Sequence, residues 1–489
     1  MTKKNQYNFP ILPIKNGLLH EQVYHSLRDA ILDGRLHPGN KIPSSRAMAE
    51  ILSISRNSII AGFERLLDEG YLVTKRGSGT YISDIIPDEL TKVQIPTTKS
   101  EIYSPVDLEI NPNIYAMLDI WKKLQASLAN NSLFNIGIGC ADLFPHQTWG
   151  RLLKRAWRQY QHSQISHNDP AGFQPLRAAI SQYARATRGL NCTEEQIIIV
   201  NGTQQAINLA TQVLTQPSNN VWLDDPGYDG AYGVFLSAGM TVNSVTSDQQ
   251  GMDVFYAIKN LPTAKLVFTA PSHQFPLGGV LSLERRLHLL EWAAEHKSWI
   301  FEDDYNSEFR YSGRPLQALQ GLDKYQRVIY AGSFSKMMFP EFRLGFMIVP
   351  TPLIDAFKLA KYYADSSSSF LEQATLTLFI TEGHYARHVR RVRRACNERK
   401  KALVDAIERY LGDKFCVHPA DSGIHLVCWL RHGLTEDQVI EASQTLGFKI
   451  QPLSRYCRQP PEHPAVLLGF AAHSAEELIA GIKALALLL

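Results

Sequence analysis

The sequence predicts an α/β protein with two folded parts: a small N-terminal winged helix-turn-helix domain and a larger domain built around a mostly parallel sheet. At 489 residues the chain is longer than one hydrophobic core usually supports. The N-terminal part contains three helical patterns and a hairpin pattern, whereas farther along short apolar strands alternate with helices, as in a sheet that helices cover on both faces. We expect domains at 1–84 and 131–489 and a linker at 85–130, where prolines interrupt any periodic pattern.

Composition and cysteine usage argue against several classes of protein. Hydrophobic residues make up 45% of the chain and charged residues 20%, and no apolar tract is long enough to span a bilayer. The first ten residues lack the apolar core of a secretory signal. The six cysteines are scattered without a CxxC pair, which indicates reduced thiols rather than disulfides or a zinc site. We expect a cytoplasmic protein with no metal site and no membrane partner.

The net charge of +3 belongs to the N-terminal part. Residues 1–85 hold 11 lysines and arginines against 8 aspartates and glutamates, whereas the rest of the chain holds 39 of each. An excess of this size mildly favours a polyanionic partner for the N-terminal domain.

Three helical segments open the N-terminal domain. The first has an apolar residue at every fourth position and stops at Gly34. Ser44 and Ser45 can cap a short second helix from Arg46, and Ser55 can cap a third that ends at Gly70. The apolar residues expected on the inner faces of the first and third helices are Leu19, Val23, Leu27 and Ile31, then Ile59, Ile60, Phe63 and Leu67.

A hairpin pattern follows the third helix. Strands at Leu72–Thr74 and Thr80–Ile82 flank a tight turn that is rich in glycine. Three helices and a hairpin, with the second and third helices joined by a short turn, predict a winged helix-turn-helix.

This arrangement predicts a DNA-binding surface. The third helix would enter the major groove, where Arg56 can bind guanine and Asn57 adenine, while Arg46 and nearby serines grip phosphates. Lys75 and Arg76 lead into the wing. The alternative is a helical scaffold with an exposed charged face. The predicted DNA-binding residues are Ser45, Arg46, Ser55, Arg56, Asn57, Lys75, Arg76, Gly77 and Gly79.

The same segment resembles the GntR family of DNA-binding domains over nearly all of its length. The resemblance implies binding to double-stranded operator DNA as a dimer. It lies in Leu19–Gln22, Gly34–Leu36, Pro38-Gly39, Pro43–Arg46, Ser55–Asn57, Gly70-Tyr71 and Gly77–Thr80.

The larger domain carries a lysine at the end of an apolar strand. Lys336 follows Val328–Tyr330, and a buried charged lysine tends to lose its proton or to find a partner. A neutral amine can form a Schiff base with an aldehyde cofactor, whose phosphate Ser333, Ser335 and Arg343 would surround. Taken alone, the motif also suits a surface lysine.

Three other strand ends carry residues that suit the same cofactor. Asp303 can hold a pyridine nitrogen protonated, and Tyr305 can donate a hydrogen bond to the ring oxygen. Thr203 and Gln204 begin a helix whose free N–H groups can bind phosphate, and Tyr228 could stack on the ring. In isolation, a solvated loop, an ordinary helix start and a loop plug explain these residues equally well.

In combination the four motifs resemble the fold-type I aminotransferases over roughly residues 131–489. The segments 269–276 and 303–309 are similar to the MocR-type subfamily of GntR regulators, in which a winged helix is fused to this domain. The resemblance implies a smaller C-terminal subdomain, pyridoxal 5'-phosphate on Lys336 as the Schiff-base lysine, and a homodimer with its cofactor site at the subunit interface.

The sequence departs from the enzymes of this superfamily at three positions. Phe275 stands where they commonly have Asn, so His273 or Gln274 would supply ring contacts; we assign His273 to the site. A leucine within 466–471 replaces the usual carboxylate-binding arginine. His167 stands where relatives often have Tyr.

Two arginines are candidates for the missing carboxylate contact. Arg455 and Arg458 lie close in sequence, although a surface loop is the alternative for both. Transamination needs an electron sink, a lysine that moves protons and a clamp for the amino acid, and only the clamp is in doubt. We therefore predict a transcription regulator that responds to pyridoxal phosphate or to an amine or amino acid, without physiological turnover. The alternatives are an aminotransferase with an accessory DNA-binding domain and a cofactor-free binding module.

Overall fold

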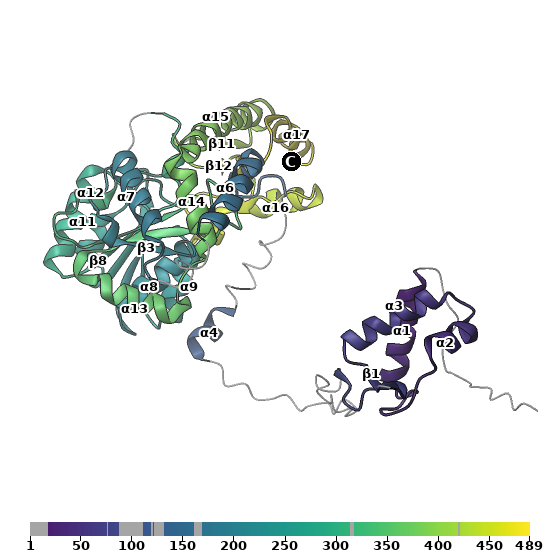
Figure 1. Cartoon of the computed structure of the whole chain (residues 1–489). Helices are drawn as coiled ribbons and strands as arrows, with labels where there is room; N and C mark the ends of the chain where they lie inside the picture. Colours follow the sequence, from purple (N-terminus) through teal and green to yellow (C-terminus); the bar gives the residue numbers. More distant parts are fainter. Residues whose placement is uncertain are drawn as a thin grey trace, which may run out of the picture. The chain divides into compact units, whose positions relative to one another are not determined.

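The chain forms two compact units, Met1–Leu108 and Glu109–Leu489 (Figure 1). Each has its own hydrophobic core. None of the helices in the described ranges has the length and apolar character that crossing a membrane requires. The computed structural model describes residues 18–75, 77–87, 111–118, 121, 132–160, 169–312, 317–418 and 421–489.

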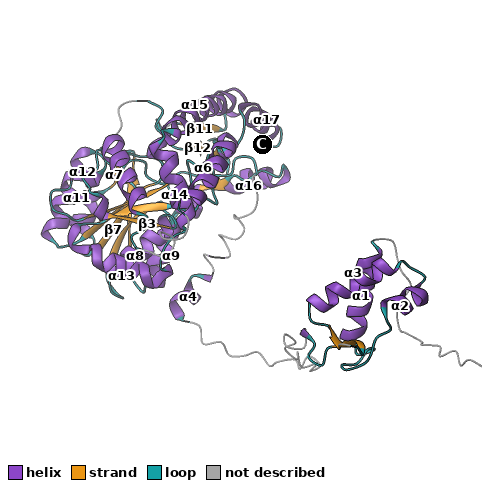
Figure 2. Ribbon diagram, in the orientation of Figure 1, coloured by secondary structure: helices purple, strands orange, loops and turns teal. Residues whose placement is uncertain are grey.

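The first unit has the predicted order of three helices and an antiparallel hairpin (Figure 2). The Ser44 hydroxyl accepts a hydrogen bond from the backbone N–H of Ala47 at 3.3 Å. The Ser55 hydroxyl accepts one from the N–H of Ser58 at 3.2 Å. A serine therefore caps each of the two helices that the short turn joins, the second and third of the unit. The elements are α1 (Leu19–Leu32), α2 (Ser45–Leu52), α3 (Arg56–Asp68), β1 (Leu72–Lys75) and β2 (Gly79–Ile82).

The inner face of α3 differs from the prediction in its last turn. Ile59 and Phe63 are buried, but Leu66 is the fully buried leucine, whereas Leu67 and Ile60 are half-buried. Position 66 lies seven residues after position 59, which is close to two turns at 3.6 residues per turn, so it returns to the same face.

The hairpin is held by its own strands and by the segment before α2. Lys75 pairs with Gly79 across the turn, where Gly77 has a φ of 75° that favours glycine. The N–H of Ile42 donates to the carbonyl of Thr80 at 3.0 Å, so the chain before α2 lies along β2.

An eight-stranded sheet forms the centre of the second unit, in the order β3-β10-β9-β8-β7-β4-β5-β6. The five strands from β9 to β5 run parallel, and β10 is antiparallel to both of its neighbours. The strand β3 therefore points the same way as β9. The strands are β3 (Ile197–Val200), β4 (Asn220–Asp225), β5 (Thr241–Asp248), β6 (Gly251–Met252), β7 (Leu266–Thr269), β8 (Trp299–Asp304), β9 (Val328–Ser333) and β10 (Gly345–Ile348).

Successive residues of the central strands face two different cores. Phe268 and Phe301 pack with α8, α9 and α13, whereas Val267 and Ile300 pack with α10, α11 and α12. Helices therefore cover both faces of the sheet, as predicted. These helices are α8 (Thr203–Leu214), α9 (Asp229–Ser237), α10 (Val254–Asn260), α11 (Leu283–Glu295), α12 (Leu319–Leu322) and α13 (Ile354–Asp365).

A smaller C-terminal subdomain packs on this sheet. Its four antiparallel strands have the order β11-β12-β14-β13, and one core joins Leu468 and Ile482 of the subdomain to Ile199 of β3. The remaining elements are α4 (Pro112–Ala116), α6 (His146–Gln159), α7 (Gln174–Arg188), α14 (Phe370–Thr381), α15 (His384–Leu411), β11 (Phe415–Val417), β12 (His425–Leu430), α16 (Glu436–Thr445), β13 (Gln451–Pro452), β14 (Ala465–Gly469) and α17 (Ala475–Ala486).

Candidate cofactor cavity and nucleic-acid interface

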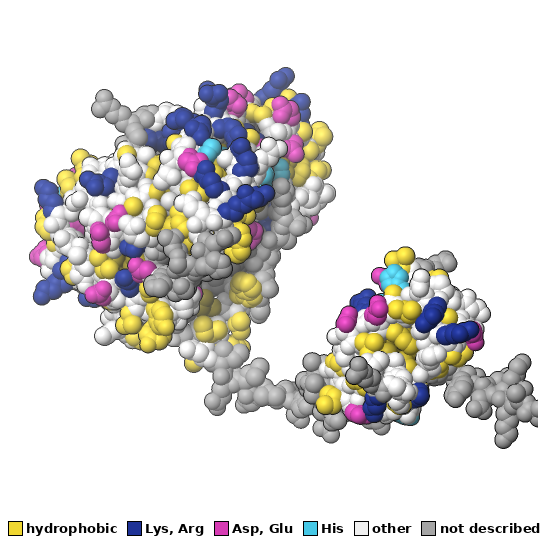
Figure 3. Space-filling view, viewed as in Figure 1, with side chains coloured by type: hydrophobic (Ala, Val, Ile, Leu, Met, Phe, Trp, Pro, Cys, Tyr) yellow, Lys and Arg dark blue, Asp and Glu magenta, His cyan; other side chains and the backbone are white. Residues whose placement is uncertain are grey.

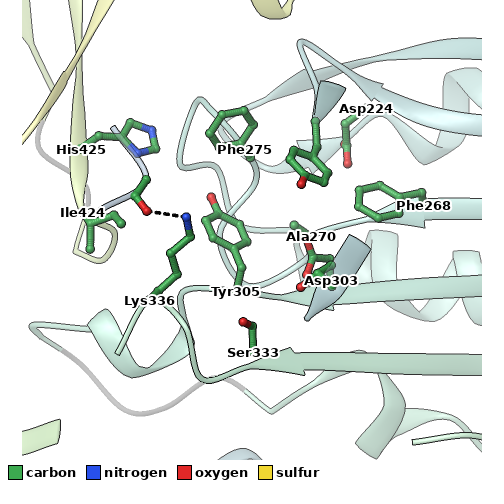
Figure 4. A pocket seen from close by; sticks show the side chains of 13 residues that line it. Asp224, Phe268, Ala270, Phe275, Asp303, Tyr305, Ser333, Lys336, Ile424 and His425 are labelled. Carbon is green, nitrogen blue, oxygen red and sulfur yellow. Dashed lines mark hydrogen bonds between the residues drawn. The ribbon is translucent and has the colours of Figure 1, made fainter. Parts of the chain in front are cut away.

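The predicted cofactor residues come from strand ends that meet at one edge of the large sheet. Because β3, β4, β7, β8 and β9 point the same way, the turns that follow them lie together. A cavity of about 120 Å³ lies at this edge (Figure 4). It is lined by Gly137, Thr203, Asp224, Tyr228, Phe268, Ala270, Phe275, Asp303, Tyr305, Ser333, Lys336, Ile424 and His425.

Lys336 extends from the turn after β9 into the cavity. Its Nζ donates to the carbonyl of Gly137 at 2.5 Å. Burial lowers the pKa of Lys336, the Asp303 carboxylate opposes this shift, and Arg343 adds to it. A Cβ on Gly139 would lie 1.9 Å from the Lys336 carbonyl oxygen, so only glycine allows this segment to pass so close. The lowered pKa favours the neutral, nucleophilic amine.

Strand alternation in β8 separates two neighbouring aspartates. Asp303 lines the cavity, whereas Asp304 faces the other side and accepts hydrogen bonds from Arg188 Nε at 2.7 Å and the Tyr330 hydroxyl at 2.6 Å. Burial, and next the charge of Asp304, raise the pKa of Asp303 to about 7. Within the described chain the buried Oδ1 of Asp303 has no hydrogen-bond partner. Such a carboxylate suits a cationic ligand group.

A tyrosine and a histidine next to Asp303 also have unused polar atoms. Neither the Tyr305 hydroxyl nor His273 Nε2 has a partner of hydrogen-bonding geometry among the described residues. His273 Nδ1 lies 2.9 Å from the Ser422 hydroxyl, and burial lowers the pKa of His273 to about 3, so its ring is neutral. The two ring centres are 6.0 Å apart. Because only Tyr305 lines the cavity, His273 stands behind it.

The turn between β3 and α8 forms a corner with anion-binding character. Gly202 precedes α8 with a φ of 93°, and Thr203 begins the helix at the cavity edge. The free N–H groups of a helix start attract phosphate. Arg343 Nη2 donates to the Asn201 carbonyl at 3.2 Å, which places a guanidinium against the same turn.

Of the other residues predicted to contact the phosphate or the ring, some line the cavity and others lie outside the lining. Ser333 lines the cavity, but the Ser335 hydroxyl donates to the Phe342 carbonyl at 2.5 Å and is occupied by that bond. Tyr228 lines the cavity and its hydroxyl donates to Gln204 Oε1 at 3.2 Å, so Gln204 supports Tyr228 from outside the lining.

Phe275, the residue at which the sequence was expected to depart from the enzymes it resembles, itself lines the cavity. Gln274 is occupied by backbone groups: its amide donates to the Pro226 carbonyl at 2.6 Å, and its Oε1 accepts from the Leu277 N–H at 3.1 Å. Of the two candidates for ring contacts, Gln274 is therefore occupied by bonds to the backbone, whereas His273 still has an unused ring nitrogen. His167 lies outside the described residues.

The candidate carboxylate contacts are used elsewhere. Leu468 in β14 is fully buried in the core. Arg458 Nη2 binds Asp229 Oδ1 at 2.8 Å, and Arg455 donates to Gln451 at 2.8 Å with its Nε 3.9 Å from Asp229. Neither arginine lines the cavity; together they join the C-terminal subdomain to the start of α9.

Sequence reasoning missed the lining residues that come from distant segments. Gly137 precedes α6, while Ile424 and His425 lie at the start of β12. His425 Nε2 lies 2.8 Å from the Pro276 carbonyl, which holds the imidazole in place. The pair of glycines at 137 and 139 was the one visible trace of this part of the wall.

In the first unit the predicted DNA-binding residues gather at the starts of α2 and α3. Arg56 Nε lies 3.5 Å from the Ser45 hydroxyl, which brings the two helix starts together. Arg46, Ser55 and Asn57 are exposed beside them. The arrangement can present guanidinium and amide groups to base edges while helix N–H groups face phosphates.

The wing carries two lysines around one tyrosine. Lys75 Nζ lies 4.8 Å from the ring centre of Tyr81, and Lys41 Nζ lies 5.8 Å from it. Lys41 was not singled out from the sequence; a Cβ on Gly79 would lie 2.9 Å from its Cε. Gly77 is exposed at the tip, and Arg76 lies outside the described residues.

Two family descriptions match the two parts of the chain. Residues 19–82 match "Bacterial regulatory proteins, gntR family" and residues 141–477 match "Aminotransferase class I and II".

Curated relatives share this arrangement along their length. The chain is 36% identical to the probable rhizopine catabolism regulatory protein MocR of Rhizobium meliloti, over 96% of this chain and 93% of MocR. It is 29% identical to the pyridoxine biosynthesis transcriptional regulator PdxR of Corynebacterium glutamicum, over 94% of this chain and 93% of PdxR. Among solved structures, the kynurenine aminotransferase of Pyrococcus horikoshii has a TM-score of 0.69 at 24% identity, covering 79% of this chain and 96% of that chain. The last match bears on the fold alone.

Proposed function

Because the chain belongs to the MocR-type subfamily of GntR transcription regulators, we propose that it regulates transcription through pyridoxal 5'-phosphate held on Lys336. The winged helix binds operator DNA, and the aminotransferase-like domain senses the cofactor or an amine or amino acid that reacts at the same place. The observation that carries this proposal is one cavity lined by Lys336 and by the Asp303 carboxyl, whose buried Oδ1 has no hydrogen-bond partner among the described residues, in a chain with a GntR domain.

The donors around the cavity match the groups of this cofactor. The unused Asp303 Oδ1 would pair with a protonated ring nitrogen, and the unused Tyr305 hydroxyl would donate to the ring oxygen. The start of α8 at Thr203, together with Arg343 and Ser333, would hold the phosphate. Tyr228 would stack on the ring. His273, Gln204 and Ser335 would act by positioning these groups.

Pyridoxal phosphate, when bound, supplies an aldehyde and an electron-withdrawing ring. The protein supplies an amine whose pKa is lowered by burial. The described lining contains one lysine, Lys336, and no arginine, so no guanidinium is in place there to clamp a substrate carboxylate. This supports sensing rather than efficient turnover, since a sensor needs only a ligand-dependent difference between two conformations.

We further propose a homodimer, because GntR-type operators are expected to have two half-sites that a two-fold symmetric protein can contact together. Analytical ultracentrifugation tests this: a monomer at concentrations that saturate DNA would contradict it.

The cofactor attachment is tested by borohydride reduction and peptide mass spectrometry. We expect the cofactor mass on Lys336 in the wild-type protein and no modified peptide in Lys336→Ala. The control is Lys324→Ala, at an exposed position, which should leave the label on Lys336. Lys361 does not suit this purpose because it is fully buried and paired with Asp365. A label at another lysine, or none, overturns this part of the proposal.

The regulatory step is tested by gel shift on DNA upstream of the protein's own gene while pyridoxal phosphate is titrated. We expect sequence-selective binding whose affinity changes with the cofactor in the wild-type protein but not in Lys336→Ala. Turnover at about 1–1000 per second with amino acids and 2-oxo acids would instead favour the aminotransferase.

A further inference from the structure

A basic surface lies on the second unit, over α6 and the first half of α15. Figure 3 shows lysine and arginine side chains gathered where Figure 1 draws these two helices. We call it the α6–α15 surface. Its exposed members are Arg151, Lys154, Arg155, Arg158, Arg387, Arg390, Arg391 and Arg394.

Three contacts link the first half of α15 and the turn before it to α6 and the segment that leads into α6, so their cations belong to one surface. Arg155 of α6 makes an ion pair with Glu382, two residues before α15 begins. Arg391 of α15 donates to the carbonyl of Leu143, just before α6. The rings of Phe144 and His388 pack edge to face with their centres 6.0 Å apart.

The surface has almost no compensating negative charge. The helix α6 contains no aspartate or glutamate, and α15 has none before Glu398. Glu382 is the acid that pairs with a member of the surface in the described structure. The chain beyond residue 85 has equal numbers of acidic and basic side chains, so this concentration is local rather than a property of the whole domain.

We propose that the α6–α15 surface binds the phosphate backbone of DNA that flanks the operator. Exposed lysines and arginines at i, i+3 and i+4 on a helix are about 5–6 Å apart, and α6 and α15 each carry such a set. Such a row neutralises consecutive phosphates without reading sequence. The first unit already brings the chain to DNA, so flanking duplex reaches the second unit at a high effective concentration.

The experiment compares two lengths of DNA. One duplex is trimmed to the footprint of the wild-type protein upstream of its own gene, and the other carries about 30 more base pairs on each side, roughly 100 Å of duplex per side. The variant combines Lys154→Gln, Arg390→Gln and Arg394→Gln, which are exposed and make no ion pair within the described residues. The matched control combines Lys259→Gln, Lys265→Gln and Lys324→Gln, which remove the same charge from exposed positions outside the α6–α15 surface.

We expect extension to strengthen wild-type and control binding by at least about tenfold, and to leave the triple variant unchanged. The slope of log affinity against log salt on the long duplex should fall by about 3 in the variant, because each lost phosphate contact removes about one. Unchanged melting temperatures exclude misfolding of either triple variant.

If lengthening the duplex raises the affinity of all three proteins equally, the inference is overturned. It is also overturned if the wild-type protein prefers vesicles that contain roughly one-quarter phosphatidylserine, an anionic lipid, to the long duplex. The inference depends on DNA binding by the first unit and not on the cofactor. Loss of the cofactor response with a normal length effect would therefore contradict only the proposed sensing, and the reverse result would contradict only this surface.

Discussion

At the scale of single residues, the cavity keeps one carboxyl group in an unfavourable state. Asp303 is buried with an oxygen that lacks a partner, and its pKa is raised from 3.8 to about 7. The Oδ1 of the adjacent Asp304 also lacks a partner among the described residues, but its Oδ2 accepts from Arg188 and Tyr330, so the charge of that carboxylate is compensated. A positively charged ligand group that paired with this oxygen would remove the cost of burying it unpaired.

We predict a pH-dependent stability for the ligand-free protein that Asp303→Asn removes in part. Because the folded state holds a proton that the unfolded state releases above pH 3.8, wild-type stability falls between about pH 4 and 7. Between pH 5 and pH 7 the free energy of unfolding of Asp303→Asn, relative to that of the wild type, should rise by at least about 1 kcal/mol. One pKa unit corresponds to about 1.4 kcal/mol. Denaturant unfolding at each pH measures this, with the exposed Asp405→Asn as control. Parallel curves for Asp303→Asn and wild type would refute it.

The raised pKa should also respond to the cofactor. A pyridinium nitrogen beside Asp303 favours the ionised carboxylate, so saturating pyridoxal phosphate should flatten the pH dependence of wild-type unfolding. Denaturant unfolding at each pH with cofactor present tests this. If the free energy of unfolding depends on pH as steeply as without cofactor, Asp303 does not contact the ring nitrogen.

At the scale of elements, the cavity depends on a short segment that only two glycines marked in the sequence. The chain at 137–139 runs beneath Lys336, where the Gly137 carbonyl accepts its Nζ hydrogen bond. The sequence predicted the strand ends because polar residues there follow apolar runs, and parallel strands bring such ends together. It could not predict Gly137, Ile424 or His425, since their approach depends on how the C-terminal subdomain packs on the sheet. The serine caps of α2 and α3 were predictable because capping is local.

We predict that Gly139→Ala displaces Lys336. The added Cβ would lie 1.9 Å from a backbone oxygen, which forces the segment or the lysine to move. Cofactor affinity should fall at least about tenfold, measured by absorbance titration. Gly150→Ala in α6 meets no atom within 4 Å and should bind the cofactor normally. Normal binding by both variants would show that this segment does not set the position of the lysine.

At the scale of the whole molecule, separate cores allow separate responses. The winged helix has a core of its own, and all the described residues that line the cofactor cavity belong to the second unit. The fold of each unit followed from its own pattern of caps, turns and strands. The sequence gives no comparable pattern for how ligand binding in one unit would change the other.

Calorimetry should therefore show two unfolding transitions, only the larger of which responds to pyridoxal phosphate. At a free concentration of 100 times Kd the stabilisation is about 2.7 kcal/mol, so the larger transition should rise by several degrees. Lys336→Ala should show a smaller rise. A single transition, or an equal rise in both, would show that the units unfold together.

The alternation of side chains along β8 has one more consequence. Within Trp299–Asp304, deletion of a single residue would exchange the two aspartates: the carboxyl that now meets Arg188 would turn into the cavity, and its neighbour would turn into the core. A substitution of Asp303 removes only the cavity carboxyl, whereas a shortened strand loses both the ligand site and the core packing. Natural variation in the family should therefore conserve the length of this strand.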